Sequence, residues 1–136
     1  MNTIFVYGTL LNNEILDIIL GHTPEKHTAY LEGYKRVTVL GEKYPAIFPE
    51  EGCTVAGALI TGLNDADIAR LDDYEDICYS RQAVVVTLED STPHDCMTYI
   101  YRPYYYDDLS DNAWSNNDFR EHHLQAFLEA LQQFKG

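Results

Sequence analysis

LDDYEDICYSR, residues 71–81, joins a predicted helix to a predicted strand. Asn64 can cap a helix over residues 65–73, whose apolar positions recur at helical spacing. The residues after the stretch, AVVVTL, are β-branched and apolar and predict a strand over residues 80–88. The acidic residue in the middle of the stretch, Glu75, is therefore expected at or just past a helix-to-strand junction.

Glu75 is the carboxylate in this chain for which we predict a chemical role. It lies between Tyr74 and Tyr79 in the sequence, and a carboxylate among aromatic rings is poorly solvated, which raises its pKa towards values useful for a base. The alternative is that Glu75 is one of 22 acidic residues that mostly face solvent. This stretch alone leaves both interpretations open.

A strand, a glycine turn and a helix open the chain. TIFVY, residues 3–7, predicts a short buried strand, and a helix is expected from about residue 13 to residue 20. Between them, Tyr7-Gly8-Thr9-Leu10 can point successive backbone N–H groups the same way and bind a carboxylate or an oxyanion. An ordinary strand-to-helix turn is the alternative interpretation of these four residues.

Further strands are expected over residues 28–40, with Gly33 as a β-bulge, and over residues 53–62, where Gly57 permits close approach of another group. The segment YPAIFP, residues 44–49, holds two prolines and is interpreted as an ordered loop rather than a central strand or helix. Its aromatic residues could form a pocket wall or fill the core, and the sequence leaves both interpretations open. Residues 80–101 predict a hairpin that turns near Pro93.

An aromatic, irregular segment over residues 102–116 predicts an ordered loop, and a last helix follows, capped by Asn116 or Asn117. The adjacent His122 and His123 point to different sides of that helix, so a shared metal is not expected. The predicted fold class is α+β: a curled or closed, mixed sheet with helices packed outside it.

Length and composition bound the class of protein. A chain of 136 residues with 46% hydrophobic content suits one domain, residues 1–136. A net charge of −13 disfavours nucleic-acid and membrane partners, and no apolar run approaches the ~20 residues of a membrane span. The N-terminal residues do not resemble a secretory signal, so we predict a cytoplasmic protein. Three cysteines without C-x-x-C spacing favour neither a disulfide framework nor a zinc site.

Four segments in order resemble the γ-glutamylcyclotransferase-like family, and most closely its branch of plant avirulence-induced-gene-like proteins. Tyr7-Gly8-Thr9-Leu10 is similar to the YGTL/YGSL loop of the family. Residues 71–75, followed by Tyr79 and Arg81, are similar to its acidic motif, L-D-x-[FY]-E and then Y-x-R. Residues 44–49 and 114–128 extend the resemblance over nearly the whole chain.

The resemblance implies a small, mixed, largely antiparallel β-barrel with flanking helices. It also implies cleavage of a small γ-glutamyl substrate with release of 5-oxoproline, without a cofactor or metal. By motif matching, Glu75 would be the catalytic acid/base and the loop Tyr7, Gly8, Thr9 and Leu10 would bind substrate. Many members have glycine directly after the glutamate, where this chain has Asp76.

Two further candidates for lining a substrate pocket are Tyr79 and Tyr101. The tyrosines at 104–106 could line it as well, and structural packing is the alternative for each of these residues. The competing function is a non-catalytic protein that keeps the cavity for a small acidic ligand. In either case we predict a monomer or a weak homodimer.

Overall fold

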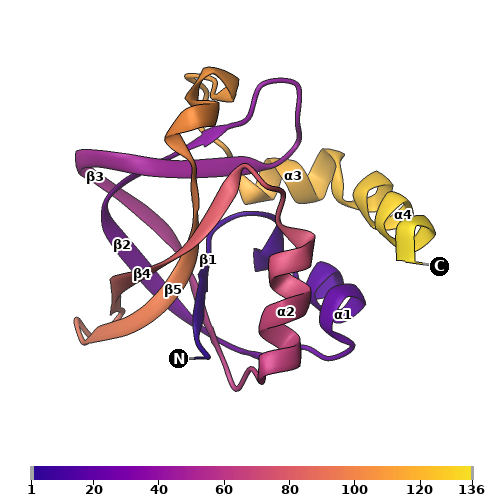
Figure 1. The fold of residues 1–136 in the computed structure, drawn as a ribbon, viewed down its shortest axis with the longest axis horizontal. Helices are drawn as coiled ribbons and strands as arrows, with labels where there is room; N and C mark the ends of the chain where they lie inside the picture. Colours follow the sequence, from indigo (N-terminus) through magenta and orange to yellow (C-terminus); the bar gives the residue numbers. More distant parts are fainter. Residues whose placement is uncertain (1, 136) are drawn as a thin grey trace.

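In residues 2–135, which the computed structural model describes (side chains for residues 2–133), five strands close into a barrel in the order β1-β3-β2-β4-β5. Figure 1 shows this barrel beside the helices. The strands are β1 (Ile4–Val6), β2 (Glu25–Thr38), β3 (Pro45–Thr61), β4 (Tyr79–Leu88) and β5 (Pro93–Tyr101). β1 and β5 run parallel, and the other neighbouring strands pair antiparallel. The predicted mixed, largely antiparallel barrel is confirmed.

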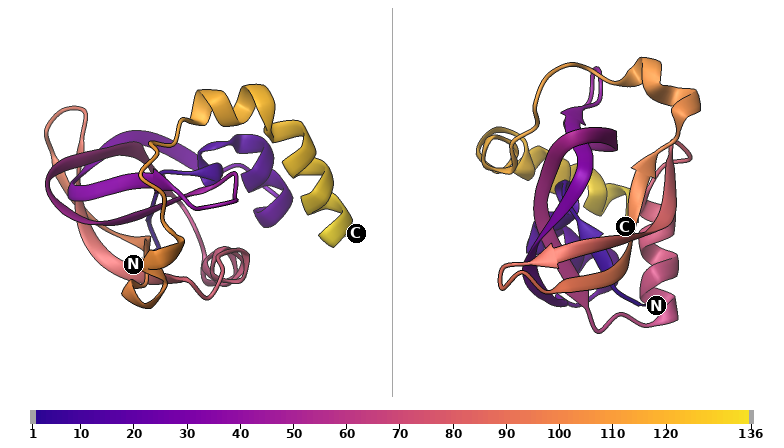
Figure 2. Two further views of the ribbon diagram at one scale, coloured as in Figure 1. Left: turned by 90° about the horizontal axis from the view of Figure 1, so that it is seen from above. Right: turned by 90° about the vertical axis from the view of Figure 1, so that its left-hand side faces the viewer.

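The helices lie outside the barrel and mostly towards one end of it, as two further views show (Figure 2). They are α1 (Asn13–Leu20), α2 (Asp65–Tyr74), α3 (Asn116–His122) and α4 (Leu124–Lys135), with short 3-10 turns η1 (Thr9–Leu11) and η2 (Pro103–Asp108). α1 packs against both α2 and α4. None of the described helices is long and apolar enough to span a bilayer.

β1 is apolar throughout because both of its faces are buried. Phe5 belongs to a core that also holds Leu31, Val55 and Leu59 from the long strands β2 and β3. Its neighbour Ile4 belongs to a second core shared with α1 and α2. Successive side chains of a strand point to opposite faces, so this short strand joins the two cores.

Two glycines shape the barrel as the sequence predicts. The register of β2 against β3 shifts between Glu32 and Tyr34, and Gly33 between them has φ +85°. Gly57 of β3 meets β1 so closely that a Cβ there would collide with the carbonyl oxygen of Val6 and lie 2.9 Å from the ring of Phe5. The bulge bends β2, and the missing side chain lets β1 and β3 close on each other.

The prediction of a loop over residues 44–49 is wrong. Residues 45–49 form the first part of β3, where Pro45 pairs with Thr38 and Pro49 pairs with Tyr34. Within the described chain this part of β3 pairs with β2 alone, so the missing proline N–H groups interrupt no second ladder. The two prolines correctly exclude a central position but are compatible with an edge.

The prediction of one last helix is also wrong, because the structure has two helices there. The helix is broken at His123, which has φ −131° and ψ −18°, so that α3 and α4 are separate helices. The N-cap is Ser115, whose hydroxyl accepts from the Asp118 N–H at 3.3 Å, one residue before the predicted caps. The preceding segment is ordered, as predicted, and is anchored to the barrel by a bridge between Leu109 and Val39.

Candidate active site

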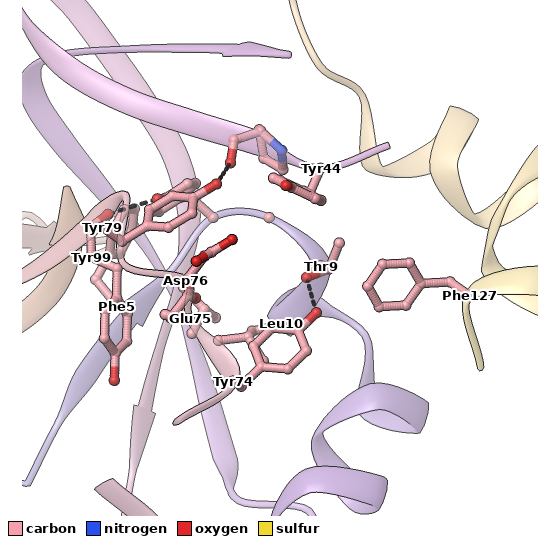
Figure 3. Close-up of a pocket in the computed structure, with 14 residues that line it drawn as sticks. Phe5, Thr9, Leu10, Tyr44, Tyr74, Glu75, Asp76, Tyr79, Tyr99 and Phe127 are labelled. Atoms are coloured by element: carbon pink, nitrogen blue, oxygen red, sulfur yellow. Dashed lines mark hydrogen bonds between the residues drawn. The ribbon is translucent and has the colours of Figure 1, made fainter. Parts of the chain in front are cut away.

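A cavity of about 180 Å³ opens where β1, the start of β3 and the end of α2 meet. Figure 3 shows the side chains around it. Most of the wall comes from residues 5–10, 44–45 and 74–76; Tyr79, Tyr99 and Phe127 complete it. The cavity therefore brings together the glycine turn and the acidic motif, which are more than 60 residues apart in the sequence.

The turn at residues 7–10 presents backbone donors. Its hydrogen bonds run from the Leu11 N–H to Gly8 O (2.9 Å) and from the Asn12 N–H to Thr9 O (3.1 Å). Among the described residues, no backbone acceptor faces the N–H groups of Gly8, Thr9 and Leu10. The turn therefore has the free donors that an anion needs.

Contacts from three directions fix this turn. The Arg36 guanidinium donates to Tyr7 O (2.8 Å), and Asn12 Nδ2 donates to Thr9 O (2.9 Å). A Cβ on Gly8 would lie 2.8 Å from the ring of Pro45, so the glycine lets the two segments approach each other. Arg120 of α3 donates to the Asn12 side chain at 2.8 Å, which ties the C-terminal helices to the same turn.

Glu75 is the C-cap of α2, as its predicted place at the junction requires. Its N–H donates to Leu71 O at 3.1 Å, while its φ of −75° and ψ of 138° already turn the chain out of the helix. Among the described residues, its carboxyl group has no hydrogen-bond or ion-pair partner. Burial, followed by the negative charges of Asp72 and Asp76, raises the pKa of Glu75 to about 8.

Asp72 and Arg81, which also belong to the acidic motif, form an ion pair. Arg81 Nε donates to Asp72 Oδ1 at 2.9 Å, and the Tyr99 hydroxyl donates to the same oxygen at 2.7 Å. These bonds join the end of α2 to β4 and β5. The two residues therefore fix the helix end on which Glu75 lies.

A second, more polar cavity of about 310 Å³ also borders Glu75. It shares Glu75, Asp76, Tyr79 and Tyr99 with the first, and Asp72, Ile77, Arg81 and Arg102 complete its lining. Glu75 thus borders both a small, mainly aromatic cavity and a wider, charged one.

The structure gives the candidate residues Tyr79 and Tyr101 different positions. Tyr79 lines both cavities, with its hydroxyl donating to Pro45 O at 2.7 Å. Tyr101 lines neither: it packs edge-on behind Tyr79, with ring centroids 5.0 Å apart, and its hydroxyl donates to Asp108 at 3.2 Å. The structure therefore places Tyr101 in the packing behind Tyr79 and at neither of these two cavities.

Other wall residues were not predicted as site residues. Tyr74 directly precedes Glu75, and that position alone could have indicated it. Tyr99 follows Thr98 on β5, and the hairpin register that places it opposite Arg81 could have indicated it too. Tyr44 belongs to the aromatic segment 44–49, for which a pocket wall was one of the two open interpretations. Phe127 carries no local signal, because α4 brings it to the cavity only in the folded chain.

The barrel thus has a small cavity that is bordered both by a carboxyl group with a raised pKa and by a turn of free N–H donors. The sequence matches the model of the family described as "Gamma-glutamyl cyclotransferase, AIG2-like" over residues 4–121. The chain belongs to this family.

Two relatives from Arabidopsis thaliana illustrate the match. The chain is 30% identical to AIG2-like protein D over 135 residues, which cover 98% of this chain and 89% of that protein. It is 31% identical to AIG2-like protein C over 132 residues, which cover 96% of this chain and 76% of that protein.

Solved structures share the fold. A solution structure of an Arabidopsis thaliana protein superposes with a TM-score of 0.71 at 29% identity, covering 98% of this chain and 81% of that one. A structure titled "Gamma-glutamyl cyclotransferase" superposes with a TM-score of 0.68 at 18% identity, covering 96% and 86% of the two chains. The second likeness concerns the fold alone.

Proposed function

We propose that this protein is a γ-glutamylcyclotransferase, which releases 5-oxoproline from a γ-glutamyl amine or peptide with Glu75 as general acid/base. One observation carries the proposal: a carboxyl group with a pKa of about 8 and no protein partner among the described residues borders the same cavity as the free N–H groups of residues 8–10. Membership of the family supports the same reaction.

The size of the cavity suits a folded γ-glutamyl group. Its volume of about 180 Å³ is comparable to an engineered protein cavity of about 150 Å³ that binds benzene, so a five-membered ring fits. Nucleophile and electrophile belong to the same γ-glutamyl group. Holding that group in its ring-closing conformation can lower the barrier by about 7 kcal/mol in well-oriented cases.

The reaction moves two protons. The α-amino nitrogen forms a bond to the γ-carbonyl carbon, and the bond from that carbon to the leaving nitrogen then breaks. The nucleophile begins as an ammonium and ends as a lactam N–H, so it loses two protons, and the leaving amine gains two and departs as an ammonium. A carboxyl group with a pKa near neutrality can accept and return these protons in turn.

The turn supplies the electrostatic part of the mechanism. Free N–H groups at Gly8, Thr9 and Leu10 can donate to the α-carboxylate or to the oxyanion that develops on the γ-carbonyl oxygen. Loss of one oxyanion donor typically costs about 3 kcal/mol of transition-state stabilisation. The second cavity, which Glu75 also borders, offers the leaving amine a place beside the group that protonates it.

The test is incubation of the protein with γ-glutamyl peptides, γ-glutamyl amines and glutathione, followed by quantification of 5-oxoproline. Release of 5-oxoproline from at least one substrate is expected. Binding of these compounds without turnover across the panel would instead support the non-catalytic ligand-binding function. The observation that motivates this second candidate is Asp76, a carboxylate at the cavity wall where many members have glycine.

Asp76→Asn should move the pH dependence of turnover to lower pH. Asp76 is one of the negative charges that raise the pKa of Glu75, so its removal lowers that pKa and leaves more Glu75 ionised at pH 6. We expect the acidic limb of kcat/KM to shift down by about 0.5–1 pH unit. The asparagine oxygen can still accept the Ile77 N–H, which now donates to Asp76 at 2.7 Å.

Asp73→Asn is the matched control for this pH profile. Asp73 is an exposed acid on α2 that is not among the causes of the raised pKa of Glu75. Its pH profile should overlay that of the unchanged protein. An unshifted profile for Asp76→Asn, or an equal shift in both variants, would contradict the assignment of the acidic limb to Glu75.

A further inference from the structure

Two hydroxyl groups meet at the wall of the first cavity. Thr9 Oγ1 and the Tyr74 hydroxyl oxygen lie 2.8 Å apart, and both residues line the cavity. Figure 3 shows the bond between them, on the side of the cavity that Phe127 approaches. Thr9 belongs to the glycine turn and Tyr74 directly precedes Glu75, so the bond joins the two segments of the candidate site.

This pair has one proton more than its mutual bond uses. Each hydroxyl carries one donor proton, and a single hydrogen bond between them consumes one of the two. Among the described residues, neither hydroxyl has a second partner in the protein. One O–H group, on either Thr9 or Tyr74, is therefore available to a ligand in the cavity.

Three other tyrosine hydroxyls at this wall donate to groups within the fold. Tyr7 donates to Tyr99 O at 2.6 Å, Tyr79 donates to Pro45 O at 2.7 Å, and Tyr99 donates to Asp72 at 2.7 Å. Each of those protons is used within the fold. The Thr9–Tyr74 pair differs from these three hydroxyls because, among the described residues, its spare proton has no acceptor in the protein.

The surroundings favour a singly charged anion as the acceptor. Thr9 contributes both to the pair and to the turn of free N–H groups, so a ligand atom held by the turn lies beside the pair. Of the described residues, those lining this cavity include Glu75 and Asp76 but no lysine or arginine. Neutral donors beside two acidic groups suit a carboxylate and disfavour a phosphate dianion.

We propose that the Thr9–Tyr74 pair donates a hydrogen bond to the α-carboxylate of the γ-glutamyl group, beside the N–H donors of the turn. The choice of this ligand rests on the proposed function. Tyr74 then becomes a substrate-binding residue that acts on the same group as the turn, while the next residue, Glu75, handles the protons.

The test compares two ligands by titration, 5-oxoproline and its neutral amide, against Tyr74→Phe, Thr9→Val and the double variant. A hydrogen bond to a charged group is roughly twice as strong as one to a neutral group. The double variant should therefore bind 5-oxoproline about tenfold more weakly and the amide no more than about threefold more weakly. The single variant that loses more affinity identifies the donor.

Tyr101→Phe is the matched control, because that hydroxyl lies outside both cavities, and its affinities should not change. Equal losses for the two ligands would show a structural role and overturn the proposal, as would unchanged 5-oxoproline affinity or no binding of 5-oxoproline to the unchanged protein. If the double variant does not fold, the single variants Tyr74→Phe and Thr9→Val are tested in the same way, by comparing their loss of affinity for 5-oxoproline with their loss of affinity for the amide. The readout is binding, so it stays valid even if no substrate is turned over.

Discussion

Glu75→Gln should abolish 5-oxoproline release while leaving the barrel folded. Glutamine keeps the shape of the side chain but cannot exchange a proton, and loss of a general acid/base typically costs a factor of 10² to 10⁴ in rate. The measurement is kcat/KM on whichever γ-glutamyl substrate the unchanged protein turns over. Full activity in this variant would show that Glu75 is not the acid/base.

Glu75→Gln should also raise the free energy of unfolding, relative to that of the unchanged protein, by more at pH 8 than at pH 5. The pKa of Glu75 is about 8 in the fold, against an ordinary value of 4.5. Between those values the unfolded chain has lost a proton that the folded chain keeps, so the free energy of unfolding falls as pH rises. Below pH 4.5 both states are protonated and this cost vanishes.

Urea unfolding of both proteins at the two pH values measures the effect. Because glutamine does not titrate, the variant avoids the cost, and its advantage at pH 8 should be on the order of 2–3 kcal/mol. Asp73→Asn, which changes an exposed carboxylate nearby, should show no comparable gain. An advantage that did not grow with pH would mean that Glu75 is solvated in the fold.

Gly57→Ala should cost more stability than any surface substitution, about 3 kcal/mol or more. A Cβ at this position would collide with the Val6 carbonyl oxygen and lie 2.9–3.0 Å from two ring atoms of Phe5. Neither neighbour can withdraw easily, because one belongs to the backbone of β1 and the other is fully buried. Urea or thermal unfolding measures the loss.

Ala56→Ser is the matched control, since it adds one atom at the preceding position of β3, on an exposed side chain. It should change the free energy of unfolding by less than about 0.5 kcal/mol. If Gly57→Ala unfolded at the same urea concentration as the unchanged protein, β1 and β3 would not approach as closely as the structure shows.

Sequence reasoning succeeded where local rules suffice. The helix over residues 13–20, the bulge at Gly33 and the place of Glu75 at a helix end all follow from signals within a few residues. Closure of the barrel follows less directly. The residues alone predicted a curled or closed sheet, and the family resemblance indicated the barrel, since no strand reveals its partner across the chain.

Long-range packing explains the errors. Two prolines in residues 45–49 suggested a loop, because the sequence does not show that this part of β3 has a partner on one side only. Tyr101 alternates with Ile100 along β5, but whether a buried ring faces a cavity or another ring depends on Tyr79, which blocks it. The break at His123 lies in a run of good helix formers, and nothing in that run marks it.

The parallel seam between β1 and β5 also bears on how the protein emerges from the ribosome. Ile4 pairs with Met97, so β1 cannot pair with β5 until the chain between them has been synthesised. At ordinary elongation rates this synthesis takes roughly 5–20 s. During that time the apolar β1 has no complete partner surface, and the turn at residues 7–10 faces no Glu75. The two segments of the candidate site therefore lie apart in the nascent chain, and a chaperone that shields its first ten residues should raise the yield of folded protein.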